Sequence, residues 1–373
     1  MRVLESVSAV SLAAVLGWAW AGQPQEETWI VSGQSNAFGT APLPGPHPDP
    51  KVQMFDEKDN AWITAREPLA MIGRGVGAWH TAAVQVAQSS WTIRLMGYAQ
   101  GDAIQLWMGE GICWTRLAAN IQKCGEHAGV FLWYQGEANG VAKTSAQDYE
   151  ARLKELVARV RECAKNPQML AVIIQLGASK LERGDFIPIR EAQRQFVMSD
   201  GNALLVPALG RSLKDACHLG KDAYFELGGE IARALLKTRY NQKNVNWPGP
   251  VLDAALLSKD GNTAWAHFAE VRKLANCEPD DFVVIDKNGA VKCLKATAGN
   301  TRVLLTLERP VVLPATLIYG FGQAPKASLV DEAGNRAPAV HMNVSQGAEP
   351  ADSETACTNG AGRGPTEKSE KQP

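Results

Sequence analysis

Residues 28–36 read TWIVSGQSN, and this stretch joins an apolar run to a turn that carries a serine. The run Thr28–Val31 is short and rich in β-branched residues, which is typical of a buried strand. Gly33 permits a tight turn, and Ser35 follows it. A strand that enters such a turn can present a hydroxyl group at the carboxyl edge of a parallel sheet, where open α/β folds bind their ligands. The tetrapeptide alone is weak evidence, because Gly, Ser and Asn are ordinary turn residues.

The same alternation of strand and helix continues from Glu27 to Tyr240. The two clearest helices, at 149–164 and 224–237, place large aliphatic residues on one stripe and charged residues opposite. Further strands are predicted between the helical patterns, at 92–98, 130–134, 170–175 and 203–207. A parallel sheet with helices on both faces accounts for this order, so we predict an α/β domain of three layers at 27–240.

A change of composition at Asn246–Pro250 (NWPGP) indicates a linker, because its prolines interrupt regular structure. Short β-type runs follow it at 282–285, 291–294, 302–307 and 315–318. We therefore expect a small β-sandwich at 251–344. The segment 345–373 has almost no large apolar residue to bury, and we expect a disordered tail there.

The N-terminal residues have the form of an export signal. Arg2 precedes an apolar run from Val7 to Trp20, and Ala19-Trp20-Ala21 fits the cleavage pattern of small residues. The alternative, a membrane anchor, is less favoured because the run is shorter than the ~20 residues that cross a bilayer. We predict a signal peptide at 1–21 and a secreted or periplasmic protein, without membrane contact after cleavage.

The charges exclude one class of partner. Lys and Arg together number 38 and Asp and Glu 39, which gives a net charge of −1. Such a chain has no long-range field to attract a phosphate backbone, so we expect no nucleic-acid partner. The oligomeric state is left open.

The chain holds seven cysteines, so at least one thiol stays unpaired within it. Cys113 with Cys124, and Cys277 with Cys293, are close enough in sequence to be candidate disulfide pairs in an exported protein. Neither a CxxC nor an HxxxH spacing is present. We therefore predict no metal site and no cofactor.

Asp215 and His218 stand three residues apart, just before the helix predicted at 224–237. A serine nucleophile needs an imidazole to take its proton, and the imidazole needs a carboxylate to fix its tautomer. One loop could supply both groups to Ser35. The alternative is that His218 is an ordinary solvated loop residue.

Two more blocks follow predicted strands. Gly101 comes after the strand at 92–98, and Gln135 and Asn139 come after the strand at 130–134. Backbone N–H groups and side-chain amides in such positions can stabilise an oxyanion. Alternatively, Gln135 and Glu137 are buried residues that join loops by hydrogen bonds.

Taken in chain order, GQSN at 33–36, GYAQGD at 97–102, QGEAN at 135–139 and DACH at 215–218 resemble the blocks of the SGNH hydrolases. The resemblance is to the branch with sialate O-acetylesterases and the acetylxylan esterases of carbohydrate esterase family six. It covers about Thr28 to Leu236, with further matches at EPL (67–69), GVG (75–77) and REAQ (190–193). It implies a flavodoxin-like α/β/α fold and a cofactor-free esterase that removes acetyl groups from a carbohydrate.

The resemblance also implies residue roles. Ser35 would be the nucleophile, His218 the general base and Asp215 its orienting carboxylate. The oxyanion would be bound by the backbone N–H groups of Ser35 and Gly101 and by a side-chain amide, that of Gln135 or alternatively Asn139.

This chain departs from the family pattern in two blocks. The family usually has Gly-Gly-Thr or Gly-Gly-Ser where this chain has Gln100-Gly101-Asp102, so a carboxylate stands near a site that must stabilise an anion. The third block often ends in Asp, whereas here it ends in Asn139. The second departure leaves the choice of amide donor open.

The blocks do not separate an acetyl group on sialic acid from one on xylose, so acetylxylan esterase is the alternative activity. Arg74 is a candidate to bind the carboxylate of a sialic acid. A non-catalytic carbohydrate-binding protein on an esterase scaffold is an alternative of another class. Ser35, Asp215 and His218 together argue against it, because a binding protein has no need of all three.

Overall fold

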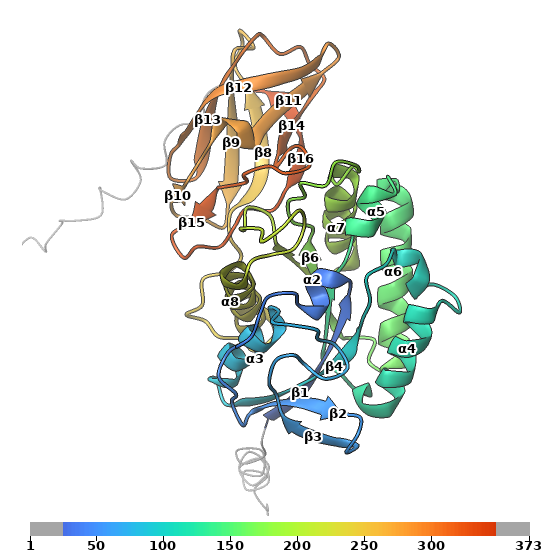
Figure 1. Ribbon diagram of the computed structural model, residues 1–373. Helices are drawn as coiled ribbons and strands as arrows, with labels where there is room; N and C mark the ends of the chain where they lie inside the picture. The colour runs from blue at the N-terminus through green and yellow to red at the C-terminus, as the bar shows by residue number, and fades with distance from the viewer. Residues whose placement is uncertain (1–24, 348–373) are drawn as a thin grey trace, which may run out of the picture.

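A sheet of seven strands forms the centre of the larger domain in the computed structural model, which describes residues 25–347 (Figure 1). The strands lie in the order β3-β2-β4-β1-β5-β6-β7. All neighbouring pairs are parallel except β3 with β2. The strands span Gln25–Gly33 (β1), Val52–Asp56 (β2), Ala61–Thr64 (β3), Trp91–Ala99 (β4), Val130–Tyr134 (β5), Leu170–Gln175 (β6) and Ala203–Pro207 (β7).

Helices cover both faces of this sheet, which confirms the predicted layers (Figure 1). Helices α3 and α8 pack together on one face, and α4, α6 and α7 lie on the other. Their bounds are Trp79–Ala87 (α3), Ile112–Asn120 (α4), Ala146–Cys163 (α6), Ile187–Asp200 (α7) and Lys221–Thr238 (α8). Shorter elements follow the strands and α4: α2 (Ser35–Phe38), η1 (Ile104–Trp107), the π-helix η2 (Ile121–Gly125) and α5 (Glu137–Val141).

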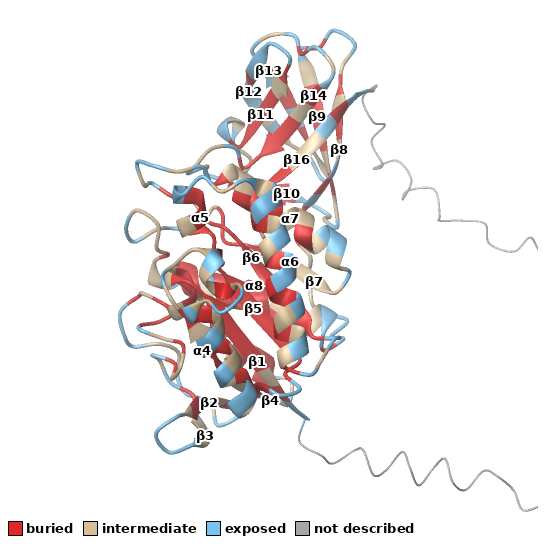
Figure 2. Cartoon of the chain, turned by 90° about the vertical axis from the view of Figure 1, so that its right-hand side faces the viewer, coloured by how far each residue is buried: buried red, intermediate tan, exposed pale blue. Residues whose placement is uncertain are grey.

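Helix α6 shows how the sequence sets these elements. Its N-cap Ser145 accepts a hydrogen bond from the backbone N–H of Asp148 at 3.1 Å, which satisfies one of the free donors of the first turn. Leu153, Leu156 and Val160 are buried on the stripe that the sequence pattern predicted. Figure 2 shows the same contrast at large scale, with buried strands between helices that expose their outer faces.

The smaller domain is a closed barrel with the strand order β11-β12-β13-β9-β8-β16-β14. The predicted β domain is present, and its strands close into one barrel because β16 pairs in parallel with β8. The strands span Val251–Leu257 (β8), Thr263–Ala269 (β9), Phe282–Asp286 (β11), Gly289–Ala298 (β12), Arg302–Leu307 (β13), Ala315–Tyr319 (β14) and Val340–Gln346 (β16). Beside it lie the 3-10 helix η3 (Pro279–Asp281) and a two-stranded sheet of β10 (Leu274–Ala275) and β15 (Val330–Asp331).

The ends of the chain bear on several predictions. The signal peptide at 1–21, Cys357 and the tail from 348 onward lie outside the described residues, whereas β16 extends to Gln346.

The other six cysteines are free thiols, so the two candidate pairs are not disulfides in this structure. Within residues 25–347, no helix is both long enough and apolar enough to cross a membrane.

Candidate active site

The turn that carries Ser35 lies at the carboxyl end of β1, between the ends of two other strands. Gly33 pairs with Ala99 of β4 on one side and with Tyr134 of β5 on the other. Its φ is +136°, and a Cβ atom there would lie 2.0 Å from the carbonyl oxygen of Tyr134. Only glycine fits, because the neighbouring backbone approaches so closely. The predicted placement of Ser35, on a turn at the sheet edge, is therefore present, and the side chain is partly exposed.

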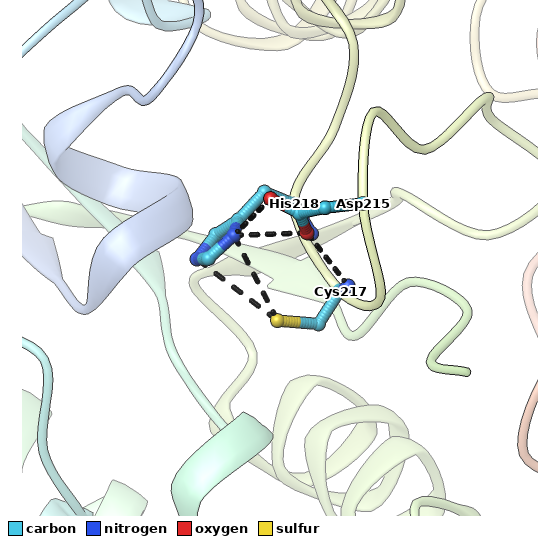
Figure 3. A group of neighbouring side chains, drawn as sticks. All are labelled: Asp215, Cys217 and His218. Carbon is cyan, nitrogen blue, oxygen red and sulfur yellow. Dashed lines mark hydrogen bonds and ion pairs between the residues drawn. The ribbon is translucent and has the colours of Figure 1, made fainter. Parts of the chain in front are cut away.

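Asp215 and His218 form a hydrogen-bonded pair on the loop between β7 and α8 (Figure 3). The Nδ1 atom of His218 lies 2.8 Å from Oδ2 and 3.0 Å from Oδ1 of Asp215. The backbone N–H groups of Cys217 and His218 both donate to Oδ1 of Asp215, at 3.0 and 2.8 Å. Burial raises the pKa of Asp215, but these hydrogen bonds outweigh it and lower the pKa to about 2. The carboxylate is thus charged at neutral pH and can fix the imidazole tautomer.

Asn36, the neighbour of Ser35, ties the serine turn to this loop. Its Nδ2 atom donates to the carbonyl oxygen of Cys217 at 3.0 Å, and its Oδ1 atom accepts from the backbone N–H of Leu219 at 3.2 Å. These two residues flank His218 in sequence. The side chain of Asn36 is buried, so the two contacts hold His218 near the serine turn.

Ser35 and His218 are brought to neighbouring positions but are not hydrogen-bonded to each other. Within the described residues, the side chain of Ser35 has no hydrogen-bond partner. A serine–histidine contact is often long in a protein without substrate and shortens when the substrate is bound. The imidazole is 26% exposed, which leaves it accessible to a reacting group.

The loop with Gly101 lies beside the serine turn, as predicted. The backbone N–H of Gln100 donates to the carbonyl oxygen of Gly33 at 2.9 Å, which fixes the two loops together. A Cβ atom at Gly101 would meet no atom within 4 Å, so the space beside it is open. Asp102 uses its Oδ1 atom to accept the backbone N–H of Ala103 at 2.8 Å. The carboxylate that departs from the family pattern therefore caps its own loop.

The structure does not support the side-chain oxyanion donors that the sequence predicted. Gln135 is fully buried, and its Nε2 atom donates to the carbonyl oxygen of Asp102 at 3.1 Å and to Oδ1 of Asn139 at 2.8 Å. Asn139 is equally buried, and its Nδ2 atom donates to Gln105 and Thr144 at 3.0 and 3.1 Å. All four amide hydrogens are thus used within the protein. The alternative interpretation of this block, in which its residues join loops, agrees better with these contacts.

Glu137 adds a second carboxylate that sequence reasoning assigned only to loop contacts. Its Oε1 atom accepts from Nδ2 of Asn36 at 2.6 Å, while its Oε2 atom is buried without a partner among the described residues. Burial raises the pKa of Glu137 to about 6, against the opposing effects of Asn36 and His218. The sequence QGE at 135–137 indicated a buried carboxylate at this position. It could not indicate that Glu137 would lie close enough to His218 to interact with it electrostatically.

Asp215, Cys217 and His218 offer ligand atoms within 4.8 Å of one another, so a metal must be considered (Figure 3). The Sγ atom of Cys217 lies 3.9 Å from both ring nitrogens of His218. Burial raises the pKa of Cys217 to about 11, so in the absence of a metal it is a neutral thiol at pH 7. Both oxygens of Asp215 already accept hydrogen bonds. The group suits proton transfer better than metal binding.

Arg74 lies at the rim of the site. Its guanidinium carbon is 4.7 Å from the ring centre of Phe38, the last residue of α2, and its Nη2 atom is 3.4 Å from Oε1 of Gln100. Arg74 is exposed. Its two contacts place it between the serine turn and the loop of Gly101.

This α/β/α fold, with a serine on the turn after β1 and an Asp/His pair on the loop between β7 and α8, is consistent with the SGNH hydrolases. The chain belongs to the family of carbohydrate esterases described as sialic acid-specific acetylesterases, whose model matches residues 25–237.

Individual relatives agree with this assignment. A probable carbohydrate esterase of Arabidopsis thaliana is 26% identical over 245 residues, which are 57% of this chain and 91% of the relative. A solved structure from Arabidopsis thaliana has a TM-score of 0.52 at 25% identity, covering 58% of this chain and 99% of its own. A carbohydrate acetylesterase from Xanthomonas citri shares the fold more completely, with a TM-score of 0.67 at 16% identity, over 85% of this chain and 80% of the other.

Proposed function

We propose that this carbohydrate acetylesterase uses Ser35 as its nucleophile, His218 as its general base and Asp215 as the group that orients His218. The observation that carries the proposal is the Asp215–His218 pair, with Nδ1 and Oδ2 at 2.8 Å, on a loop that Asn36 joins to the serine turn. The charged state of Asp215 supports it, because a carboxylate stabilises the imidazolium that forms when the base takes a proton.

In the first step, Oγ of Ser35 attacks the acetyl carbonyl carbon while its proton passes to Nε2 of His218. Backbone N–H groups of Ser35 and Gly101 bind the oxyanion, since the amides of Gln135 and Asn139 are used elsewhere. Collapse of the intermediate breaks the bond to the sugar oxygen, which takes the proton from His218. Water then repeats the sequence on the acetyl-enzyme and releases acetate.

For the substrate, we propose an O-acetylated sialic acid. The family's description supports this choice, and so does Arg74 at the rim, whose guanidinium group suits a carboxylate. Assays on O-acetyl sialosides beside acetylated xylan separate this substrate from the alternative. Preference for xylan would overturn the choice of sugar and leave the triad standing.

The triad is tested by Ser35→Ala, which removes the attacking oxygen from a partly exposed turn without disturbing the core. We expect hydrolysis of an aryl acetate to fall by ~10³-fold or more, with an unchanged circular dichroism spectrum. A chelator should leave the wild-type rate unchanged. Activity within a few-fold of wild type, or a loss on chelation that zinc restores, would contradict the mechanism.

A further inference from the structure

We propose that the β-barrel is a positioning element of the active site: it holds the loop that carries Asp215 and His218. This inference rests on the proposed roles of Ser35, Asp215 and His218. Three sets of contacts link the barrel to that loop, which spans residues 208–220 between β7 and α8.

The first set encloses the start of the loop. Leu209 follows β7 of the larger domain in sequence. Its side chain is nevertheless fully buried in the apolar core of the barrel. The next residue, Gly210, has a φ of +74°, and a Cβ atom there would lie 2.3 Å from the carbonyl oxygen of Ala327. The smaller domain therefore packs closely against the point at which the loop leaves the sheet.

The second set reaches the catalytic pair itself. The backbone N–H of Lys180 donates to the carbonyl oxygen of Ala216, which directly follows Asp215, at 2.7 Å. Gln323 of the barrel holds both neighbours of Lys180. Its carbonyl oxygen accepts from the backbone N–H of Ser179 at 2.9 Å, and its side-chain Nε2 atom donates to the carbonyl oxygen of Leu181.

Arg190 of α7 strengthens this link. Its buried guanidinium group donates to the carbonyl oxygens of Gly322 and Gln323 in the barrel, at 2.6 and 2.9 Å. It also donates to those of Leu176 and Gly177, at 3.0 and 2.9 Å. One cation thus joins a barrel loop to the segment that leads to Lys180.

The third set acts through an ion pair. Arg211 of the loop and Glu230 of α8 form a salt bridge between side chains that are 2% and 1% exposed. The other oxygen of Glu230 accepts the backbone N–H of Arg336, a residue beyond β15, at 3.2 Å.

These contacts divide the support of the loop between the two domains. Asn36 holds the residues on either side of His218, whereas Ala216, next to Asp215, is held by the segment that Gln323 fixes. Loss of the barrel contact should therefore shift Asp215 relative to His218. A displacement of a catalytic group by ~1 Å can cost up to ~10²-fold in rate.

The test compares two glutamines of the full-length protein. Gln323→Ala removes the donor to Leu181, and Gln346→Ala removes a donor to the carbonyl oxygens of Leu257 and Ser258 within the barrel. We expect Gln323→Ala to lower kcat by ~10-fold or more with KM within twofold, and Gln346→Ala to match wild type. The acidic limb of the pH–rate profile should move to lower pH in Gln323→Ala, because the imidazolium loses part of its support.

Gln323→Met, which keeps the length of the side chain without the donor, serves if Gln323→Ala does not fold. If Ser35→Ala is inactive and the Gln323 variants equal Gln346→Ala in kcat and pH profile, the positioning role is overturned and the triad stands. If Ser35→Ala stays active, the proposed function itself fails, whatever the barrel variants do.

Discussion

Asn36 has a hydrogen-bond partner for every polar group of its side chain. Nδ2 donates to Glu137 and to Cys217, and Oδ1 accepts from Leu219 and from the hydroxyl of Tyr224 at 2.8 Å. A buried amide with all four positions filled fixes its surroundings strongly, because a partner left unpaired would cost about 1–3 kcal/mol. Aspartate could not replace it, since a second carboxylate would face Glu137 without a donor.

Glu137→Gln tests how the charge of this buried carboxylate affects the stability of the protein. Burial raises the pKa of Glu137 to about 6, so the folded protein holds this proton more tightly than the unfolded chain. That contribution favours folding below the ordinary pKa of 4.5 and is lost as the pH rises through about 6. We expect the neutral glutamine to be more stable than wild type at pH 8 by about 1–2 kcal/mol, and equal to it at pH 4. Urea unfolding at both pH values measures this, and lower stability at pH 8 would show that the charged form is favoured.

The elements that the sequence predicted most accurately are the central strands. The predicted ranges for β5, β6 and β7 agree with the structure, because short apolar runs between helices leave few alternatives. Strands β8, β9 and β16 were not predicted individually. β16 reads VHMNVSQ, and its place depends on pairing with β14 and β8, which are distant in the chain. Closure into a barrel follows from that pairing and has no local signal.

Gln135, in the segment between β5 and α5, links neighbouring elements of the larger domain. Besides its two donated bonds, Gln135 accepts the hydroxyl of Tyr149 at 3.0 Å, so it connects three parts of the domain. Gln135→Ala should lower the free energy of unfolding by about 1–3 kcal/mol, while kcat of the folded enzyme stays within ~10-fold of wild type. Denaturant unfolding and steady-state kinetics measure the two effects. A ~100-fold loss of kcat at unchanged stability would instead show that the side-chain amide of Gln135 binds the oxyanion.

At the scale of the molecule, the sequence indicated the candidate residues of the site but not how the protein supports them. Ser35, Asp215 and His218 were identified from their blocks, and the parallel sheet brings the end of β1 and the loop after β7 to the same edge. The burial of Gln135 and the insertion of Leu209 into the barrel core depend on partners from other parts of the chain. Such contacts leave no periodic pattern in the sequence, which is why they could not be predicted.

The contacts between the domains predict that they unfold together. Gln175, fully buried at the end of β6, donates to the carbonyl oxygen of Ala339 at 2.9 Å and accepts its N–H at 2.8 Å. Unfolding the barrel alone would remove this pair, two of the four carbonyl partners of Arg190 and the apolar surroundings of Leu209, so the larger domain would lose stability at the same time. We expect one calorimetric transition with equal calorimetric and van't Hoff enthalpies.

Leu305→Ala makes this test specific, because Leu305 is fully buried in the barrel core on β13. The substitution should cost about 2–5 kcal/mol, and the loss of esterase activity on heating should move down together with the single transition. Tryptophan fluorescence follows mainly the larger domain, which holds the buried Trp29, Trp79, Trp107 and Trp133, whereas the barrel holds the buried Trp265. Two transitions, with esterase activity surviving the first, would show that the larger domain folds and works without the barrel. That result would also remove the basis for assigning the barrel a role in holding Asp215 and His218.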